Sequence, residues 1–306
     1  MLGVQNLPQT SPSTDQGLRK HCPDPRIMEQ PRGTNLARQI KPPFAYYGGK
    51  TKLATDIAAL LPPHAHYVEP FAGSLAVLLA KAQSKQETVN DLDGDLMTFW
   101  RILRDRPDEL ERQCVLTPHG RAEYWASRDL DTPDDLERAR RVFVRLTQGR
   151  SHSMRPTGWW FSRAHDNQSP ADKTLSHASR IPNVARRIRS VTLEARDALD
   201  VIRDYGAEPD VCIYMDPPYL GSTRATNYRH EMLTDDAHTE FAEAVNACKA
   251  AVVISGYDSP LYAELFPGWH VTRMKGATTL SGATDRTEVL WSNTPLGQQA
   301  AFDFTA

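Results

Sequence analysis

The stretch Ile213–Leu220, "IYMDPPYL", places an acid and an aromatic ring on either side of two prolines, directly after an apolar segment. Proline fixes φ and lacks a backbone N–H, so a buried strand cannot continue through Pro217 and Pro218. A rigid turn alone accounts for the prolines, but it does not account for Asp216 and Tyr219 beside them. A carboxylate and a phenol ring held stiffly at a strand end are suited to holding a ligand there, and this is the most specific motif in the chain.

A second candidate is the stretch Val68–Ser74, "VEPFAGS", between a predicted strand and a predicted helix. Gly73 would let a ligand approach the backbone, and the helix that follows would offer unpaired N–H groups. The motif is weak by itself, because many α/β folds have a glycine at this position. It is neither a GxGxxG fingerprint nor a phosphate-binding P-loop.

Two charged residues, Asp91 and Lys50, also lie at the ends of predicted elements. Asp91 ends the next predicted strand, 18 residues after Gly73, where nucleotide-binding folds place a carboxylate that accepts ribose hydroxyls. The alternative for Asp91 is a helix N-cap, since "NDLDGDL" is rich in capping residues, but the glycine turn favours ribose binding. In "YYGGK", Lys50 starts a helix after a tight turn, either as a surface charge or as the partner of a small anion such as a carboxylate.

These residues need a scaffold that brings strand ends together, and the hydrophobic pattern predicts one. The predicted strands are residues 67–70, 87–90, 190–195, 210–215, 250–256, 269–275 and 286–293. The helices predicted to alternate with them are residues 51–61, 73–83, 95–105, 198–205, 234–249 and 259–266. Such alternation predicts an α/β fold, a parallel sheet with helices on both faces, in which ligands bind at the carboxyl ends of the strands.

Residues 107–189 interrupt this alternation and are predicted as an inserted, mainly helical subdomain, in which the polar segment 149–179 forms a long functional loop. From Arg138 to Arg196, twelve arginines and one lysine are opposed by three acidic residues, a balance of +10 in a chain whose net charge is -2. This asymmetry indicates a polyanionic partner. A solvated helix face is the alternative, although such a face would not need the tryptophans that the segment carries.

The composition limits the class of protein. A chain of 306 residues, 40% of them hydrophobic, suits a soluble protein with one large domain and an insertion. Residues 1–40, rich in Pro, Gln, Ser and Thr, are predicted as a disordered tail without a signal peptide, and residues 296–306 as a second tail. No apolar run is long enough to span a membrane. Four scattered cysteines form neither a zinc motif nor a disulfide framework, which favours a cytoplasmic location.

Together these motifs resemble the DNA adenine-N6 methyltransferases of the Dam type (D12 class, alpha group), which use S-adenosylmethionine (SAM). "DPPY" resembles the family's catalytic motif, "EPFAGS" its SAM-binding turn and "YYGGK" its N-terminal motif, in the family's order. "ISGYDSPLY" and "RTEVLW" also fit, so the resemblance covers about residues 42–293. It implies a Rossmann-like SAM-dependent methyltransferase sheet. Residues 41–106 and 190–295 would form the SAM-binding catalytic domain, and residues 107–189 the target-recognition subdomain.

The resemblance also implies a role for individual residues. The implied catalytic residues are Asp216, Pro217 and Tyr219. The implied SAM-binding residues are Tyr46 and Lys50 at the methionine part, Glu69, Phe71 and Gly73 in the turn, Asp91 at the ribose, Asp197 near the adenine, and Asp216. The chain departs from the family at one position, because the turn is often FxGxG and its second glycine is replaced by Leu75 here. No metal ion or cysteine nucleophile is implied.

The implied reaction is site-specific methylation of an adenine that is flipped out of double-stranded DNA. The lone pair of the exocyclic nitrogen is delocalised into the ring, so Asp216 and the backbone carbonyl beside Pro217 would accept its two hydrogens and make the lone pair usable. Base flipping costs a few kcal/mol, and stacking of Tyr219 on the base would offset roughly 1–3 kcal/mol of it.

The basic insertion supplies the candidates for DNA contact: Arg145, Arg150, Arg155, Trp159, Trp160, Arg163, Arg186, Arg187 and Arg189. The arginines would contact phosphates, and one or two would contact guanine edges. The two tryptophans would wedge or stack at the flipped site, or would pack the small core of the insertion.

Two alternatives to adenine methylation stay open at this point. N4-cytosine methylation would use the same pocket, because the chemistry serves any exocyclic amine, although the Asp before Pro-Pro favours adenine. A catalytically silent DNA-binding protein of the same fold is the second, and the intact "DPPY" argues against it. We expect a monomer or weak dimer whose role is restriction–modification, self-marking of a mobile element, or regulation.

Overall fold

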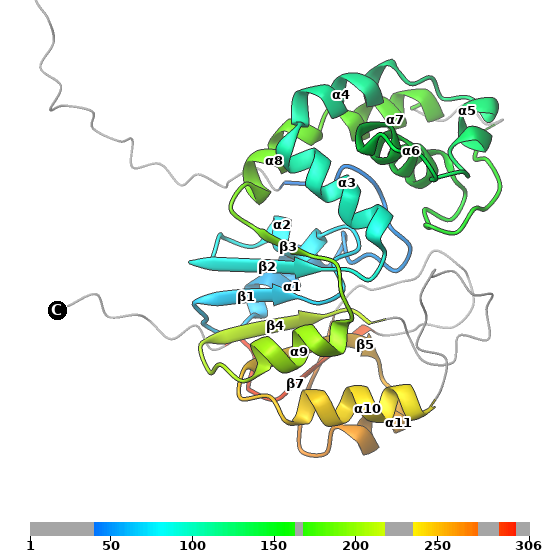
Figure 1. The fold of residues 1–306 in the computed structure, drawn as a ribbon. Coiled ribbons are helices and arrows are strands. Elements are labelled where there is room, and N and C mark those ends of the chain that lie inside the picture. The colour runs from blue at the N-terminus through cyan, green and yellow to red at the C-terminus, as the bar shows by residue number, and fades with distance from the viewer. Residues whose placement is uncertain (1–39, 163–167, 218–234, 275–287, 298–306) are drawn as a thin grey trace, which may run out of the picture. The chain divides into compact units, whose positions relative to one another are not determined.

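The computed structural model describes residues 40–162, 168–217, 235–274 and 288–297. Within these ranges a seven-stranded sheet has the order β3-β2-β1-β4-β5-β7-β6 (Figure 1). Its strands are β1 (His66–Glu69), β2 (Gln86–Asn90), β3 (Thr192–Glu194), β4 (Val211–Met215), β5 (Ala251–Tyr257), β6 (His270–Arg273) and β7 (Glu288–Ser292). Each lies within or next to a predicted strand, so the predicted α/β fold is confirmed.

The sheet is parallel except at one edge. β1 pairs in parallel with β2 and β4, β2 with β3, and β4 with β5, whereas β7 runs antiparallel between β5 and β6. The predicted parallel sheet is thus confirmed for five strands, and β7 departs from it by running antiparallel. A parallel pair requires a crossover connection, usually a helix, and the sequence between the last two strands has no helical pattern.

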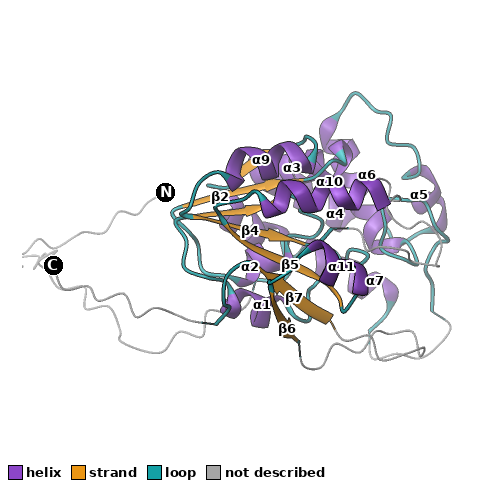
Figure 2. Ribbon diagram, turned by 90° about the horizontal axis from the view of Figure 1, so that it is seen from below, coloured by secondary structure: helices purple, strands orange, loops and turns teal. Residues whose placement is uncertain are grey.

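Helices cover both faces of the sheet, as predicted (Figure 2). Because successive side chains of a strand point to opposite faces, the strands β1, β4, β5 and β7 each contribute to two hydrophobic clusters. Tyr67, Cys212 and Val253 pack with α1 (Ala54–Leu60) and α2 (Ala76–Ala80). On the other face, the partners of Val68, Ile213, Met215 and Ile254 are α9 (Ala198–Gly206), α10 (Asp235–Asn246) and α11 (Pro260–Leu265).

The helical subdomain comprises α4 (Pro107–Leu116), α5 (Arg121–Ala126), α6 (Asp135–Gln148), α7 (Pro170–Ala178) and α8 (Ile181–Ile188). It packs on α3 (Gly94–Asp105), which contacts α4, α6 and α8. The prediction of a continuous loop over residues 149–179 is wrong, because α7 lies within it. Ser169 and Asp172 form a reciprocal capping box and Pro170 occupies the first turn, a helix-start signal present in the sequence.

Some predicted features lie outside the described residues: the tails over residues 1–39 and 298–306, and the side chains of Arg163 and Tyr219. None of the helices in the described ranges is long and apolar enough to cross a membrane.

Candidate active site

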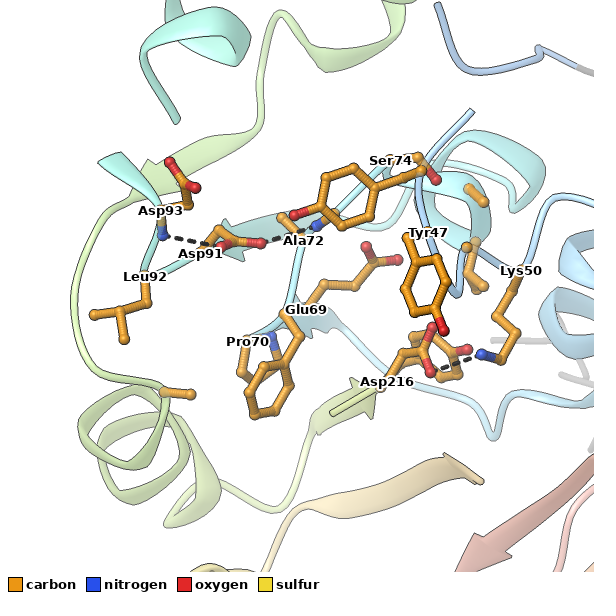
Figure 3. Close-up of a pocket in the computed structure, with 18 of the residues that line it drawn as sticks. Tyr47, Lys50, Glu69, Pro70, Ala72, Ser74, Asp91, Leu92, Asp93 and Asp216 are labelled. Carbon is orange, nitrogen blue, oxygen red and sulfur yellow. Dashed lines mark hydrogen bonds and ion pairs between the residues drawn. The ribbon is translucent and has the colours of Figure 1, made fainter. Parts of the chain in front are cut away.

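A cavity of about 360 Å³ lies at the carboxyl ends of β1, β2 and β4 (Figure 3). The strand order reverses between β1 and β4, and such switch points are where open α/β sheets bind ligands. All eight residues that the sequence assigns to the cofactor line this cavity, although they are spread over 171 positions of the chain: Tyr46, Lys50, Glu69, Phe71, Gly73, Asp91, Asp197 and Asp216. The topology thus brings the separate motifs to one place.

The turn between β1 and α2 is shaped by backbone conformations that few residues adopt. Gly73 has φ 46°, a conformation that glycine adopts without strain, and a Cβ at this position would lie 3.3 Å from Cδ1 of Tyr46, so the Tyr46 ring would have to shift by a few tenths of an ångström. Leu75, which replaces the family's second glycine, is also left-handed, with φ 55°. Its side chain is fully buried, so hydrophobic packing offsets the unfavourable backbone conformation. The Trp100 indole N–H donates to the Gly73 carbonyl at 3.1 Å and holds the turn from α3.

Asp91 ties the end of β2 to this turn. Its Oδ2 accepts a hydrogen bond from the Gly73 N–H and its Oδ1 from the Asp93 N–H, each at 3.0 Å. The N-cap of α3 is Asp93, which accepts from the N–H groups of Asp95 and Leu96. The capping function considered for Asp91 therefore belongs to Asp93, while Asp91 stays at the cavity wall (Figure 3).

Asp216 follows β4 directly and is bound from two other parts of the chain. Its Oδ1 accepts hydrogen bonds from Lys50 Nζ at 2.7 Å and from Ser255 Oγ at 3.1 Å. Lys50, only 7% exposed, also lies 3.5 Å from Oε1 of Glu288 and donates to the Gly48 carbonyl. Lys50 is thus a buried cation between two carboxylates, and the surface-charge alternative is wrong. Figure 3 shows its ion pair with Asp216 beside Tyr47.

Glu69, at the end of β1, has a different environment. Burial raises the pKa of its carboxyl to about 7, even though the Tyr67 hydroxyl and the Leu78 N–H donate to Oε1 at 2.6 and 2.8 Å and favour the charged form. A carboxyl with this pKa is partly protonated at neutral pH. The pocket therefore contains one ion-paired carboxylate, Asp216, and one that changes charge near neutrality.

The far wall of the cavity is more open. Asp197 is exposed and caps α9 by accepting the Leu199 N–H at 2.8 Å. Phe71 packs edge-on against Phe241 of α10, with ring centroids 6.4 Å apart. An apolar ring and an exposed acid in one cavity suit a flat, polar-edged group such as a nucleobase.

The comparison with protein families shows which family the chain with this pocket belongs to. Residues 46–279, well over half of the chain, match the model of the D12 class N6 adenine-specific DNA methyltransferases. The chain belongs to this family. The match begins at Tyr46 of the N-terminal motif and includes the cavity residues of all the predicted motifs.

Curated relatives are similar over most of their length. The chain is 22% identical to the type II methyltransferase M.MjaIII of Methanocaldococcus jannaschii, over 77% of this chain and 91% of that protein. It is 24% identical to the DNA adenine methylase of Salmonella typhi, over 78% of this chain and 88% of that protein. Among solved structures, a putative methyltransferase of Streptococcus mutans in complex with SAH matches at a TM-score of 0.35 and 10% identity, over 80% of this chain and 97% of that one.

The D12 enzyme methylates the N6 nitrogen of adenine in DNA, and its methyl donor is SAM. Bound SAM supplies an electrophilic methyl group on a positively charged sulfur. The pocket fits such a cofactor, because several carboxylates line it and can accept hydrogen bonds from hydroxyl and ammonium groups.

Two arginines that were predicted to contact DNA are structural. Arg145 is 2% exposed, and its guanidinium donates to three backbone carbonyls within the helical subdomain. The Arg187 side chain is buried and donates to both carboxylate oxygens of Glu87. The predictions for Arg145 and Arg187 are wrong, because these guanidinium groups are bound inside the protein and cannot reach a phosphate.

The other described candidates lie at the surface of the D12 enzyme. Arg150, Arg186 and Arg189 are exposed, and Arg155 is half-buried. Both tryptophans are half-buried and lie against cations. Trp159 stacks on Phe161 beneath the Arg121 guanidinium, which is 4.7 Å from its ring centroid. Lys173 lies 5.1 Å from the Trp160 ring centroid.

The residues at the site that were not found from the sequence include Ser255, Tyr214 and Trp100. Ser255 was detectable in principle, because it is the single polar side chain in the predicted strand 250–256. A polar residue in a buried strand needs a hydrogen-bond partner, and its partners here are Asp216 and the Tyr214 hydroxyl. Trp100 carried no signal, since a tryptophan on an amphipathic helix is ordinarily a core residue.

Proposed function

We propose that this D12-class methyltransferase acts on double-stranded DNA in the cytoplasm, as a monomer or weak dimer, and methylates a flipped adenine within a specific sequence. Asp216, Pro217 and Tyr219 are the proposed catalytic residues. The proposed cofactor site comprises eight residues that line the cavity: Tyr46, Lys50, Glu69, Phe71, Gly73, Asp91, Asp197 and Asp216. Support comes from the meeting of the N-terminal motif, the glycine turn and Asp216 of "DPPY" at one cavity.

The proposed mechanism depends on positioning. The Asp216 carboxylate accepts one hydrogen of the adenine amino group, and the backbone carbonyl beside Pro217 accepts the other. The nitrogen then becomes pyramidal and its lone pair is directed at the methyl group. As the nitrogen bonds to the methyl carbon, the bond between that carbon and sulfur would break. The carboxylate would stabilise the positive charge on the nitrogen until one amino proton is released to solvent, and no covalent bond to the protein would form. Tyr219 stacks on the base and compensates for stacking lost in the duplex.

The observation that carries this proposal is the fixed carboxylate of Asp216. Lys50 and Ser255 bond to the same oxygen from separate elements, at 2.7 and 3.1 Å. A carboxylate that served only to end a strand would not require a buried lysine and a buried serine. Preorganised groups of this kind lower a barrier without reorganising during the reaction.

The experiment that tests the function is methyl transfer from labelled SAM to unmethylated duplex DNA, followed by nucleoside analysis of the product. We expect N6-methyladenosine with the wild type. We expect at least a thousandfold lower rate with Asp216→Ala, which should still bind SAM. The control is Asp258→Ala, because Asp258 is exposed and pairs with Arg273 at the surface; its rate should match the wild type.

The alternatives give different results in the same experiment. N4-methylcytosine as the product would show that the enzyme's substrate base is cytosine and not adenine. DNA binding without transfer would identify a catalytically silent protein. Normal turnover by Asp216→Ala would overturn the proposed mechanism while leaving the family assignment intact.

A further inference from the structure

The carboxylate of Asp216 lies at the end of a short chain of hydroxyl groups. The Tyr214 hydroxyl is 3.0 Å from Ser255 Oγ, and Ser255 Oγ is 3.1 Å from Asp216 Oδ1. Ser255 is fully buried and Tyr214 is 4% exposed. Both side chains project from the central strands β4 and β5, which pair in parallel, so the spacing of the three groups is set by the sheet.

The direction of the hydrogen bonds follows from the number of hydrogens. A serine hydroxyl has one hydrogen to donate, and Ser255 has two possible acceptors besides Tyr214: Asp216 Oδ1 at 3.1 Å and the Met215 carbonyl at 3.4 Å. The carboxylate is both closer and charged, so it is the stronger acceptor. Burial and the charge of Asp216 raise the pKa of the Tyr214 phenol, which therefore stays protonated and can donate to Ser255.

We propose that Ser255 is a positioning residue for Asp216, and that Tyr214 orients the Ser255 hydroxyl. The proposal rests on the proposed catalytic function of Asp216. Lys50 bonds to the same oxygen, but it does so at the end of a flexible four-carbon side chain. Ser255 has one rotatable bond before its oxygen and a backbone fixed in β5, so it defines the plane of the carboxylate.

This arrangement predicts a specific kinetic defect. Removing the Ser255 hydroxyl leaves the Lys50 ion pair and the cofactor cavity in place, since Ser255 is not among the cavity residues. SAM and DNA should bind nearly as before, while the carboxylate is less often aligned with the amino group. Misalignment lowers kcat rather than raising KM.

The test compares kcat, KM for DNA and the SAM dissociation constant, the last by calorimetry. Ser255→Ala should lower kcat roughly 10- to 100-fold, the effect of losing a hydrogen bond to a charged group, with both binding values within about twofold of wild type. Ser255→Thr, which keeps the hydroxyl and suits a strand, should retain most of kcat. Ser292→Ala is the matched control, because Ser292 is equally buried on β7 and donates instead to the Thr294 carbonyl.

A second comparison separates positioning from general support of the fold. Tyr214→Phe should lower kcat less than Ser255→Ala, and should lower it no further when combined with Ser255→Ala, because Tyr214 acts through Ser255. Independent effects would multiply instead. Three outcomes would each overturn the proposal while the wild type stays active. They are losses of kcat that multiply in the double variant, full kcat in Ser255→Ala, and a loss of SAM binding in Ser255→Ala that parallels its loss of kcat. A wild type that methylates no adenine would overturn the proposed function, and this inference with it.

Discussion

At the scale of single residues, Asp216 and Glu69 both follow or end a strand and both line the cavity, but their carboxyl groups have different surroundings. Asp216 is bound to a lysine and a serine hydroxyl. Glu69 receives hydrogen bonds from neutral donors, Tyr67 and Leu78, and burial is the largest influence on it. Desolvation opposes a charge, so Glu69 changes charge near neutral pH, whereas Asp216 in the same cavity is held by an ion pair with Lys50.

The raised pKa of Glu69 predicts that the free energy of unfolding depends on pH. A glutamate in the unfolded chain ionises near pH 4.3, whereas the pKa of Glu69 in the folded protein is about 7. Between these values the folded protein holds a proton that the unfolded chain has released, so its stability falls as pH rises. Above pH 7 both states are ionised, and the loss levels off at roughly 4 kcal/mol.

The substitution Glu69→Gln should remove this loss, because glutamine resembles the protonated acid and still accepts from Tyr67 and Leu78. We expect the variant to be more stable than wild type by a few kcal/mol at pH 8 and equal to it near pH 4, in urea unfolding experiments at both values. Glu208→Gln, at an exposed position, should show no such difference. Parallel pH curves for wild type and Glu69→Gln would contradict the assignment of the pKa.

At the scale of elements, the sequence predicted which strand ends carry the site, but not how those ends are joined. Hydrophobic periodicity located the strands, and the parallel alternation placed Gly73, Asp91 and Asp216 on one edge. The bond from Gly73 to Asp91 and the support from Trp100 depend on how α3 packs, which no local pattern encodes. The helix α7 was missed for another reason, since its capping box was present in a segment interpreted as a loop.

Leu75 is an example of local preference overruled by packing. A left-handed conformation costs an L-residue roughly 1–2 kcal/mol, and complete burial of a leucine side chain contributes about 1.5–3 kcal/mol. The side chain is 0% exposed, so burial outweighs the strain. This balance explains how the turn keeps its shape without the family's second glycine.

The glycine turn itself yields a prediction about cofactor binding. Gly73→Ala combines a strained φ of 46° with a Cβ 3.3 Å from the Tyr46 ring, and both residues line the cavity. We expect SAM to bind at least tenfold more weakly, measured by calorimetry. The control is Gly94→Ala in the first turn of α3, where a Cβ would meet nothing within 4 Å; it should bind SAM normally and gain up to about 1 kcal/mol of stability. Equal SAM affinity in the two variants would show that the turn does not contact the cofactor.

At the scale of the whole molecule, the basic segment divides into two functions that a charge count cannot separate. Several of its arginines are neutralised within the fold: Arg140 and Arg141 by Glu137, and Arg187 by Glu87, which is 100 residues away in sequence. The pairs with Glu137 lie within α6, Arg140 also pairs with Glu123 of α5, and the pair between Arg187 and Glu87 joins α8 to β2. The arginines left at the surface, such as Arg150 and Arg189, are the ones that a DNA backbone can reach.

This division predicts that two arginine substitutions have opposite signatures. Arg150→Ala should leave stability unchanged, weaken DNA binding about equally for all sequences, and lower the slope of log affinity against log salt by about 1. Arg187→Met should instead destabilise the fold by roughly 3 kcal/mol, because it breaks a buried pair. Lys81 stays beside Glu87 at 2.7 Å and limits the loss. The salt slope of the folded Arg187→Met protein should equal that of wild type.

Fluorescence anisotropy with labelled duplexes over a range of salt concentrations gives the slopes, and urea unfolding gives the stabilities. Arg203→Ala is the control for general charge, because Arg203 is an exposed arginine on α9, outside the helical subdomain. Its removal changes net charge by the same amount and should leave the slope unaltered. A reduced slope for Arg187→Met, or an equal reduction for Arg203→Ala, would mean that DNA responds to the total charge of the molecule and not to the exposed arginines of the insertion.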